Sequence, residues 1–164
     1  MSFEHHTPSR RIKLRKIVSG GQTGVDRGAF DAALELGLEH GGWCPMGRLA
    51  EDGVIPNKYN NLMENDATEY SVRTEQNVAD SDGTLIMFRN TLFGGTQLTL
   101  TMADKHNKPH FLLDLNQFAA DTKICILTWL VEKNIQVLNC AGPRESECPG
   151  ISSQAKRTLF LVLS

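Results

Sequence analysis

Three short segments of the sequence combine glycines with polar side chains, and each follows an apolar run that predicts a β-strand. The residues of interest in the first segment are Gly20, Gly21, Gln22, Thr23, Gly24, Asp26 and Arg27. Paired glycines allow an anion to approach the backbone closely, and a following helix offers free N–H groups and the positive end of its dipole. This pattern predicts a phosphate site. The alternative is a tight turn followed by a helix that has Asp26 in its first turn.

The first segment is neither a GxGxxG sequence nor a P-loop. It lacks the Lys-Ser/Thr pair that holds a nucleoside triphosphate together with magnesium, which argues against an ATPase.

The second segment repeats the same arrangement after the apolar run 83–88, with Gly94, Gly95 and Thr96 at the start of an expected helix. Taken alone, Thr96 could equally be a helix cap after a flexible turn. A second copy of the arrangement on the same edge of a sheet favours a binding site over two unrelated turns.

The third segment follows the last predicted strand and contains Gly142, Pro143, Arg144, Glu145 and Ser146. An arginine here can bind a phosphate or carboxylate through two parallel hydrogen bonds. The alternative is a surface loop with an internal Arg–Glu pair, in which Ser146 caps the last helix.

Further candidates lie outside these segments. Arg48 and Arg73 are possible cations for the same ligand, and Asp52 is a possible acid beside Arg48. The histidines have no metal-ligand spacing, and the four cysteines form no CxxC pair, so we predict no metal site. Reduced thiols are expected, although a bridge between Cys140 and Cys148 remains open.

The elements that would position these segments alternate regularly between strand and helix. Apolar periodicity predicts strands over 14–19, 39–44, 83–88, 110–113 and 135–138, and helices over 25–36, 72–81, 96–107, 118–133 and 149–163. Such alternation predicts a Rossmann-like, doubly wound α/β fold: a mainly parallel five-stranded sheet between two helix layers. The three segments should then converge at the carboxyl edge of the sheet. Residues 45–70 receive no assignment.

Length and charge limit the possible functions. The chain has 164 residues, which fits a single domain over 14–164 preceded by a basic tail over 1–13. The formal net charge is −2, and since the first sixteen residues carry +4, the remainder carries −6. An acidic body is a poor nucleic-acid surface. The sequence has no apolar run of membrane-spanning length and no secretory signal, so we expect a cytoplasmic protein.

Several motifs together resemble a known family. The segments SGGQTGVDR, AEDG and AGPRESE, in this order, are similar to those of the molybdenum carrier proteins. That family belongs to the SLOG superfamily of Rossmann-like domains, which also includes cytokinin-releasing phosphoribohydrolases and a DNA-processing protein. The resemblance covers about residues 14–163.

The resemblance implies a groove between glycine-rich loops that holds a phosphorylated nucleotide-like or pterin ligand, with molybdenum cofactor as one candidate. It also implies a homo-oligomer, for which the apolar end at 159–163 is a possible contact. The sequence departs from the phosphoribohydrolase motif, since Thr99 and Thr101 stand where that motif carries its glutamate. We therefore favour a binding or carrier protein.

Two alternatives remain. One is a nucleotide N-glycosidic hydrolase that uses Arg48 with Asp52, or Arg144 with Glu145. The other is a regulatory, protein-binding subunit whose groove is vestigial.

Overall fold

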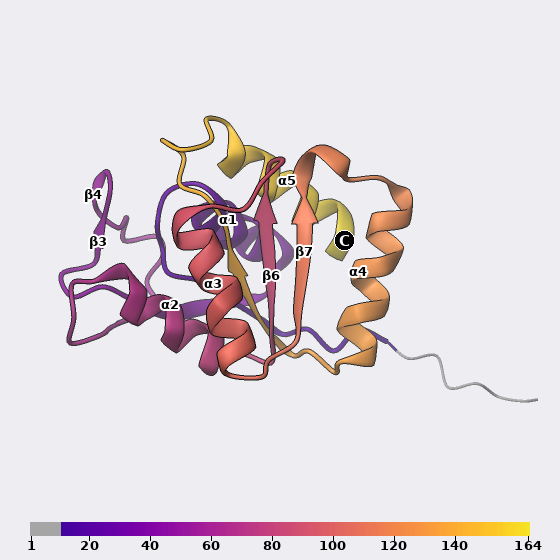
Figure 1. Ribbon diagram of the computed structural model, residues 1–164, viewed down its shortest axis with the longest axis horizontal. Helices are drawn as coiled ribbons and strands as arrows, with labels where there is room; N and C mark the ends of the chain where they lie inside the picture. The colour runs from indigo at the N-terminus through magenta and orange to yellow at the C-terminus, as the bar shows by residue number, and fades with distance from the viewer. Residues whose placement is uncertain (1–10) are drawn as a thin grey trace, which may run out of the picture.

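The computed structural model describes residues 11–164, so most of the tail predicted over 1–13 lies outside the described residues. A parallel sheet forms the centre of the molecule (Figure 1). Across the sheet the strands are β5 (Leu62–Glu64), β2 (Glu39–Cys44), β1 (Lys16–Val18), β8 (Val137–Ala141), β6 (Gly83–Phe88) and β7 (His110–Asp114). All five predicted strands are present and the predicted fold class is confirmed. β5, from the unassigned segment, is the sixth strand.

Helices cover both faces of the sheet (Figure 1). On one face α2 (Tyr70–Ala79) packs against α3 (Gly94–Lys105). On the other face lie α1 (Val25–Leu36), α4 (Ala120–Glu132) and α5 (Ile151–Leu163). The result is the expected three-layer arrangement, with two helices on one face and three on the other.

The main core lies between the sheet and the layer formed by α1, α4 and α5. The apolar run of β6 is buried, as the sequence predicts, with Leu85 and Met87 fully inside. Small side chains on α1 allow close contact with α5, because a Cβ at Gly28 would overlap the carbonyl oxygen of Ser152. The position of α5 is therefore set by the small-residue face of α1.

Residues 45–70 contain a short hairpin of β3 (Leu49–Ala50) and β4 (Gly53–Val54), followed by β5. The sequence gives little periodicity here because these strands have only two or three residues. A second, smaller core cluster that includes Ile55 and Tyr59 packs the segment against α1. The Tyr59 hydroxyl donates to Asp31 at 2.6 Å, and this bond fixes the segment to the helix.

The C-terminal part differs from the expected boundaries by two or three residues. β8 extends to Ala141, beyond the predicted end at 138, and α5 begins at Ile151 rather than at 149. At the apolar end, Leu159 and Val162 are buried, whereas Phe160 and Leu161 are exposed. The short 3-10 helix η1 (Leu115–Gln117) follows β7.

All four cysteines are unbonded, so the bridge left open between Cys140 and Cys148 does not form. Within the described residues, none of the helices has both the length and the apolar character that a membrane crossing requires.

Candidate ligand-binding site

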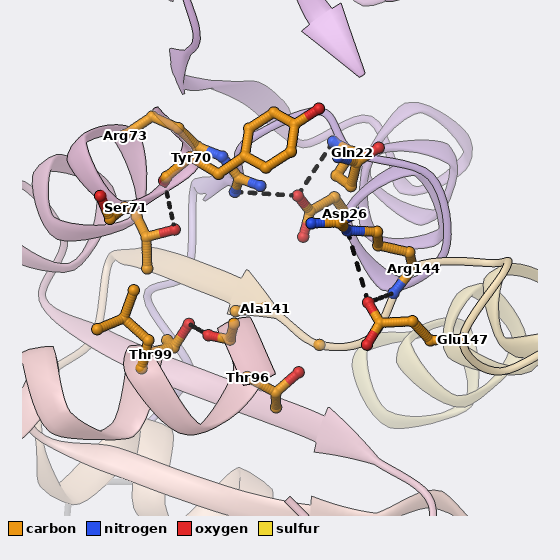
Figure 2. Close-up of a pocket in the computed structure, with 14 residues that line it drawn as sticks. Gln22, Asp26, Tyr70, Ser71, Arg73, Thr96, Thr99, Ala141, Arg144 and Glu147 are labelled. Atoms are coloured by element: carbon orange, nitrogen blue, oxygen red, sulfur yellow. Dashed lines mark hydrogen bonds and ion pairs between the residues drawn. The ribbon is translucent and has the colours of Figure 1, made fainter. Parts of the chain in front are cut away.

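The three glycine-containing segments meet at the carboxyl edge of the sheet, as the parallel topology requires. A cavity of about 80 Å³ lies between them and the α2–α3 layer, and we call it the loop pocket (Figure 2). Each segment contributes to its wall. The contributing residues are Gln22 and Asp26 from the first, Gly95 and Thr96 from the second, and Gly142 and Arg144 from the third.

The first segment does not form the fully open N–H cradle that we expected, because the protein's own groups occupy three of its N–H groups. The Gln22 N–H donates to Asp26 Oδ2 at 3.1 Å, and the Thr23 N–H donates to Gln22 Oε1 at 3.0 Å. The Val25 N–H donates to the carbonyl oxygen of Pro143 at 3.2 Å. The alternative of a closed turn therefore describes the backbone of this segment better.

The glycines of the first segment allow close packing within the protein. A Cβ at Gly20 would overlap the guanidinium of Arg73, and a Cβ at Gly24 would overlap the carbonyl oxygen of Pro143. A direct role of residues 20–24 in binding a ligand remains a prediction. Of these five residues, Gln22 lines the loop pocket.

Asp26 and Arg73 form a largely buried ion pair at the inner end of the loop pocket (Figure 2). Arg73 Nη1 lies 3.3 Å from Asp26 Oδ2, and Asp26 is 3% exposed. Burial raises the pKa of Asp26 above its usual value, and the nearby Arg73 opposes that rise without cancelling it. The structure thus brings Arg73, one of the two isolated candidate cations, into the pocket wall.

Two buried donors at the loop pocket have no partner among residues 11–164. They are Nε2 of Gln22 and Nε of Arg73. Buried polar groups in native proteins are nearly always hydrogen-bonded, and each exception calls for an explanation such as a bound molecule. Both donors belong to residues that line the loop pocket, although the two atoms themselves are buried.

Arg144 and Glu147 form the outer wall of the loop pocket (Figure 2). Arg144 Nε lies 3.5 Å from Glu147 Oε1, and the guanidinium lies 5.1 Å from the centre of the Tyr70 ring. Arg73 lies 5.7 Å from the same ring centre. Tyr70 therefore stands beside both pocket arginines.

Sequence reasoning does not identify Tyr70, which is the first residue of α2. The sequence does contain one indication of its position: Tyr70 precedes Arg73 by three residues, which places both on one face of a helix.

The N-terminus of α3 is the part of the site that keeps the expected open backbone. In the described part of the chain, the N–H groups of Gly94 and Gly95 have no hydrogen-bond partner, while the Thr96 N–H donates to Phe93 at 3.2 Å. A Cβ at Gly95 would meet no atom within 4 Å. The second segment therefore leaves room for an anion against the positive end of a helix.

Several predicted residues lie outside the loop pocket and contact other parts of the protein. Arg27 forms a two-point ion pair with Asp52, with Nη2 to Oδ1 at 2.7 Å. That hydrogen-bonded pair lowers the pKa of Asp52 below its usual range. Arg48 donates from Nη2 to the carbonyl oxygens of Ile55, Pro56 and Tyr59. The pairing of Arg48 with Asp52, weighed for a hydrolase, is therefore not assembled.

Glu145 stabilises α5 and does not face a ligand. Its carboxylate accepts hydrogen bonds from the N–H groups of Gly150 and Ser152, the latter at 3.0 Å. The pairing of Arg144 with Glu145 is absent as well, because Arg144 pairs with Glu147.

Glu51 links the first and third segments. Its carboxylate accepts hydrogen bonds from the hydroxyl groups of Thr23 and Ser146 and from the Ser146 N–H at 3.2 Å. Partial burial raises the pKa of Glu51, but these hydrogen bonds outweigh burial and lower it overall. Thr23 and Ser146 therefore hold the pocket wall together.

The structure also shows how potential metal ligands and thiol nucleophiles are arranged. Within residues 11–164, no group of three or more His, Cys, Asp or Glu side chains is placed to hold a metal ion. Burial, with a smaller contribution from Asp26, raises the pKa of the Cys140 thiol and keeps it protonated.

Comparison with known proteins places the chain in a family. The crystal structure of a protein named "Putative molybdenum carrier protein", from Syntrophus aciditrophicus SB, matches with a TM-score of 0.91 and 44% sequence identity. The match covers 94% of this chain and 98% of that one. The comparison with curated proteins finds no match. The model of the circularly permutated YpsA SLOG family matches residues 17–163, and this chain therefore belongs to that family.

Proposed function

We propose that this chain binds a phosphorylated small molecule, nucleotide-like or pterin, in the loop pocket and acts as a carrier for it. The observation that carries the proposal is that two residues lining the cavity, Gln22 and Arg73, each carry a buried donor without a partner in residues 11–164. Arg144 and the open N-terminus of α3 line the same cavity. Each of these groups favours a negatively charged acceptor.

The size of the loop pocket supports recognition of one end of a ligand. Pockets that enclose a drug-sized molecule have about 300–1,000 Å³, whereas this cavity has about 80 Å³. That volume suits a phosphate group, with the rest of the ligand outside the cavity. The Tyr70 ring beside Arg144 offers a flat surface on which a nucleobase or pterin ring can stack.

The name of the solved relative refers to molybdenum, and we propose molybdenum cofactor as the pterin form in which this chain would carry it. The residues of the loop pocket fit the phosphate group of such a pterin, and Tyr70 fits its ring. The described residues supply no cluster of metal ligands, so we propose that the cargo would be held through its organic part.

A carrier is favoured over an N-glycosidic hydrolase because the two carboxylates that the sequence offered for hydrolysis are engaged elsewhere, and the two in the pocket wall, Asp26 and Glu147, are ion-paired. Asp52 pairs with Arg27, and Glu145 binds the N-terminus of α5. A glycosidic hydrolase needs a carboxylate that can act on the sugar or the leaving group.

The test is calorimetric titration of the full chain with inorganic phosphate, AMP and GMP. We expect saturable binding, weakened about 10- to 100-fold in Arg144→Gln, because a charge-assisted hydrogen bond contributes about 1.5–3 kcal/mol. Gly95→Ala should also weaken binding, since its Cβ would occupy the space beside the α3 N–H groups. Arg15→Gln, which removes an exposed arginine elsewhere, is the matched control and should bind like wild type.

Three results would contradict the proposal. They are no saturable binding of any phosphorylated probe, equal affinity in Arg144→Gln and Arg15→Gln, and release of free base from AMP or GMP during incubation, measured by chromatography. Native mass spectrometry of the purified chain should also reveal a phosphorylated ligand that copurifies with it.

A further inference from the structure

We propose that a second cavity, beside α5, is a separate binding site for an organic anion that carries an apolar group. We call it the α5 cavity. It has a volume of about 570 Å³ and lies between α5, the loop after β6 and the loop after β7. The loop pocket faces α2 and α3, on the other side of the sheet, so this proposal is independent of the proposed function.

The two arginines that line the α5 cavity have no ion-pair partner among the described residues. They are Arg89 and Arg157. No carboxylate lies among the described residues that line the cavity. Two carboxylates accept from backbone N–H groups of lining residues, Glu145 from Gly150 and Asp114 from Asn116, but neither pairs with an arginine of the cavity. Since the chain beyond its first sixteen residues carries a net charge of −6, two guanidinium groups without an ion-pair partner form a local attraction for an anion.

The two arginines are held differently, and the difference suits ligand capture. Arg89 is fixed, because Nε donates to Gln154 at 2.7 Å and Nη1 donates to the carbonyl oxygen of Pro149 at 2.8 Å. Its Nη2 has no partner in residues 11–164 and lies beside Gly150. Arg157 is exposed on α5, one turn after Gln154, and its guanidinium makes no hydrogen bond to a described residue. A donor that is held in place and a donor that is unbonded can bind one anion together.

Apolar and polar side chains share the remaining wall of the α5 cavity. Phe118 and Leu161 line the cavity, and Leu161 is 49% exposed. Leu161 follows Arg157 by four residues on α5, so the two side chains share one face of the helix. The volume falls in the range of about 300–1,000 Å³ that small-molecule sites occupy. An aromatic carboxylate or an aromatic phosphate ester combines the charge and the apolar group that this wall would recognise.

The test is an NMR titration of the ¹⁵N-labelled full chain with benzoate, phenyl phosphate and inorganic phosphate. We expect saturable shifts of the backbone N–H signals of Gly150 and Asn116 with benzoate or phenyl phosphate. Arg157→Gln should weaken this binding at least 10-fold, and Arg157→Lys should retain part of it. Arg15→Gln, which removes one exposed charge elsewhere, should bind like wild type.

Each outcome decides the proposal. Tighter binding of either organic probe supports it, and the tighter of the two identifies the anion as carboxylate or phosphate. It is overturned if no probe gives saturable shifts at Gly150 and Asn116, or if Arg157→Gln and Arg15→Gln bind equally. It is also overturned if inorganic phosphate binds as tightly as phenyl phosphate, because the apolar wall would then contribute nothing. Shifts confined to Gly95 would assign the probe to the loop pocket and overturn the α5 site.

Discussion

The loop pocket and the α5 cavity each contain two arginines, but the surroundings of these arginines differ. In the loop pocket, Arg73 pairs with Asp26 and Arg144 pairs with Glu147. In the α5 cavity, neither Arg89 nor Arg157 forms an ion pair within the described residues. The loop pocket is small and is lined by residues that carry orphaned buried donors, whereas the α5 cavity is larger and has a partly apolar wall.

Under the two proposals, this difference corresponds to two modes of anion recognition. In the loop pocket an anion must compete with carboxylates for the guanidinium groups, so binding depends on fixed donors and the helix N-terminus. In the α5 cavity the guanidinium groups are available, so binding depends on charge and apolar contact. The loop pocket is therefore the rigid site and the α5 cavity the adaptable one.

The largest expected effect tests the rigidity of the loop pocket. Gly24 has a φ of +82°, and a Cβ there would overlap the Pro143 carbonyl oxygen. Gly24→Ala should lower the free energy of unfolding by about 3–5 kcal/mol, since backbone strain and overpacking each cost about 1–3 kcal/mol. At the α5 cavity, Gly150 has a φ of +85°, but a Cβ added there would meet no clash, since the nearest atom, Nη2 of Arg89, would be 3.6 Å away.

Gly150→Ala should therefore cost only about 1–2 kcal/mol, the strain of a left-handed residue. Urea denaturation of both variants measures the two values. Equal losses would show that the two regions are equally rigid.

The second prediction concerns the carboxyl group of Asp26. Burial raises its pKa above 3.8, so the folded state binds this proton more tightly than the unfolded state does. The contribution of Asp26 to stability is then full below about pH 4 and is lost as the pH rises through the raised pKa. Asp26→Asn should gain stability relative to wild type over that range, by up to about 1.4 kcal/mol per pH unit.

Urea denaturation of wild type and Asp26→Asn between pH 4 and pH 8 measures this trend. A loss of stability in Asp26→Asn that grows with pH would mean that Arg73 outweighs burial.

The third prediction tests competition inside the loop pocket. Glu147→Gln removes the carboxylate that pairs with Arg144 and that would repel an incoming anion. Affinity for AMP should rise about 3- to 10-fold, which corresponds to about 0.7–1.4 kcal/mol. Calorimetric titration measures the change, and benzoate binding at the α5 cavity should stay as in wild type. Weaker AMP binding would instead assign Glu147 a direct role in holding the ligand.

The smallest expected effect concerns the link between the first and third segments. Glu51→Gln should lower the free energy of unfolding by about 0.5–1 kcal/mol at pH 7, because it weakens exposed hydrogen bonds to Thr23 and Ser146. These bonds lower the pKa of Glu51, so their contribution is present above about pH 4.5 and is lost as the pH falls through the lowered pKa. Urea denaturation at pH 7 and pH 3 should show a smaller difference at pH 3 than at pH 7.

The convergence of the three glycine-containing segments could be predicted because it follows from local patterns. Alternating strands and helices imply a parallel sheet, and a parallel sheet brings the segments after β1, β6 and β8 to one edge. The site chemistry could be predicted only in part. Arg73 and Arg144 line the loop pocket, whereas Arg27 and Arg48 hold the protein together.

No local signal separates these two groups of arginines. The partner of each lies in another part of the chain, such as Asp52 for Arg27 or Tyr59 for Arg48. The sequence does not identify Tyr70 for the same reason. Its proposed stacking role depends on its position beside Arg144, which lies on a distant loop.

By itself, the sequence determined the α/β fold, the buried central strand and the edge at which the glycine-containing segments meet. These features follow from the spacing of neighbouring residues, which fixes the faces that each element must bury. Only the tertiary structure decided which glycines leave open space and which permit close packing. Gly24 and Gly95 are alike in sequence, but one faces the Pro143 carbonyl and the other an open cavity. The tertiary structure also brought Arg89 and Arg157 to one cavity, because α5, from the end of the chain, packs beside the loop that follows β6.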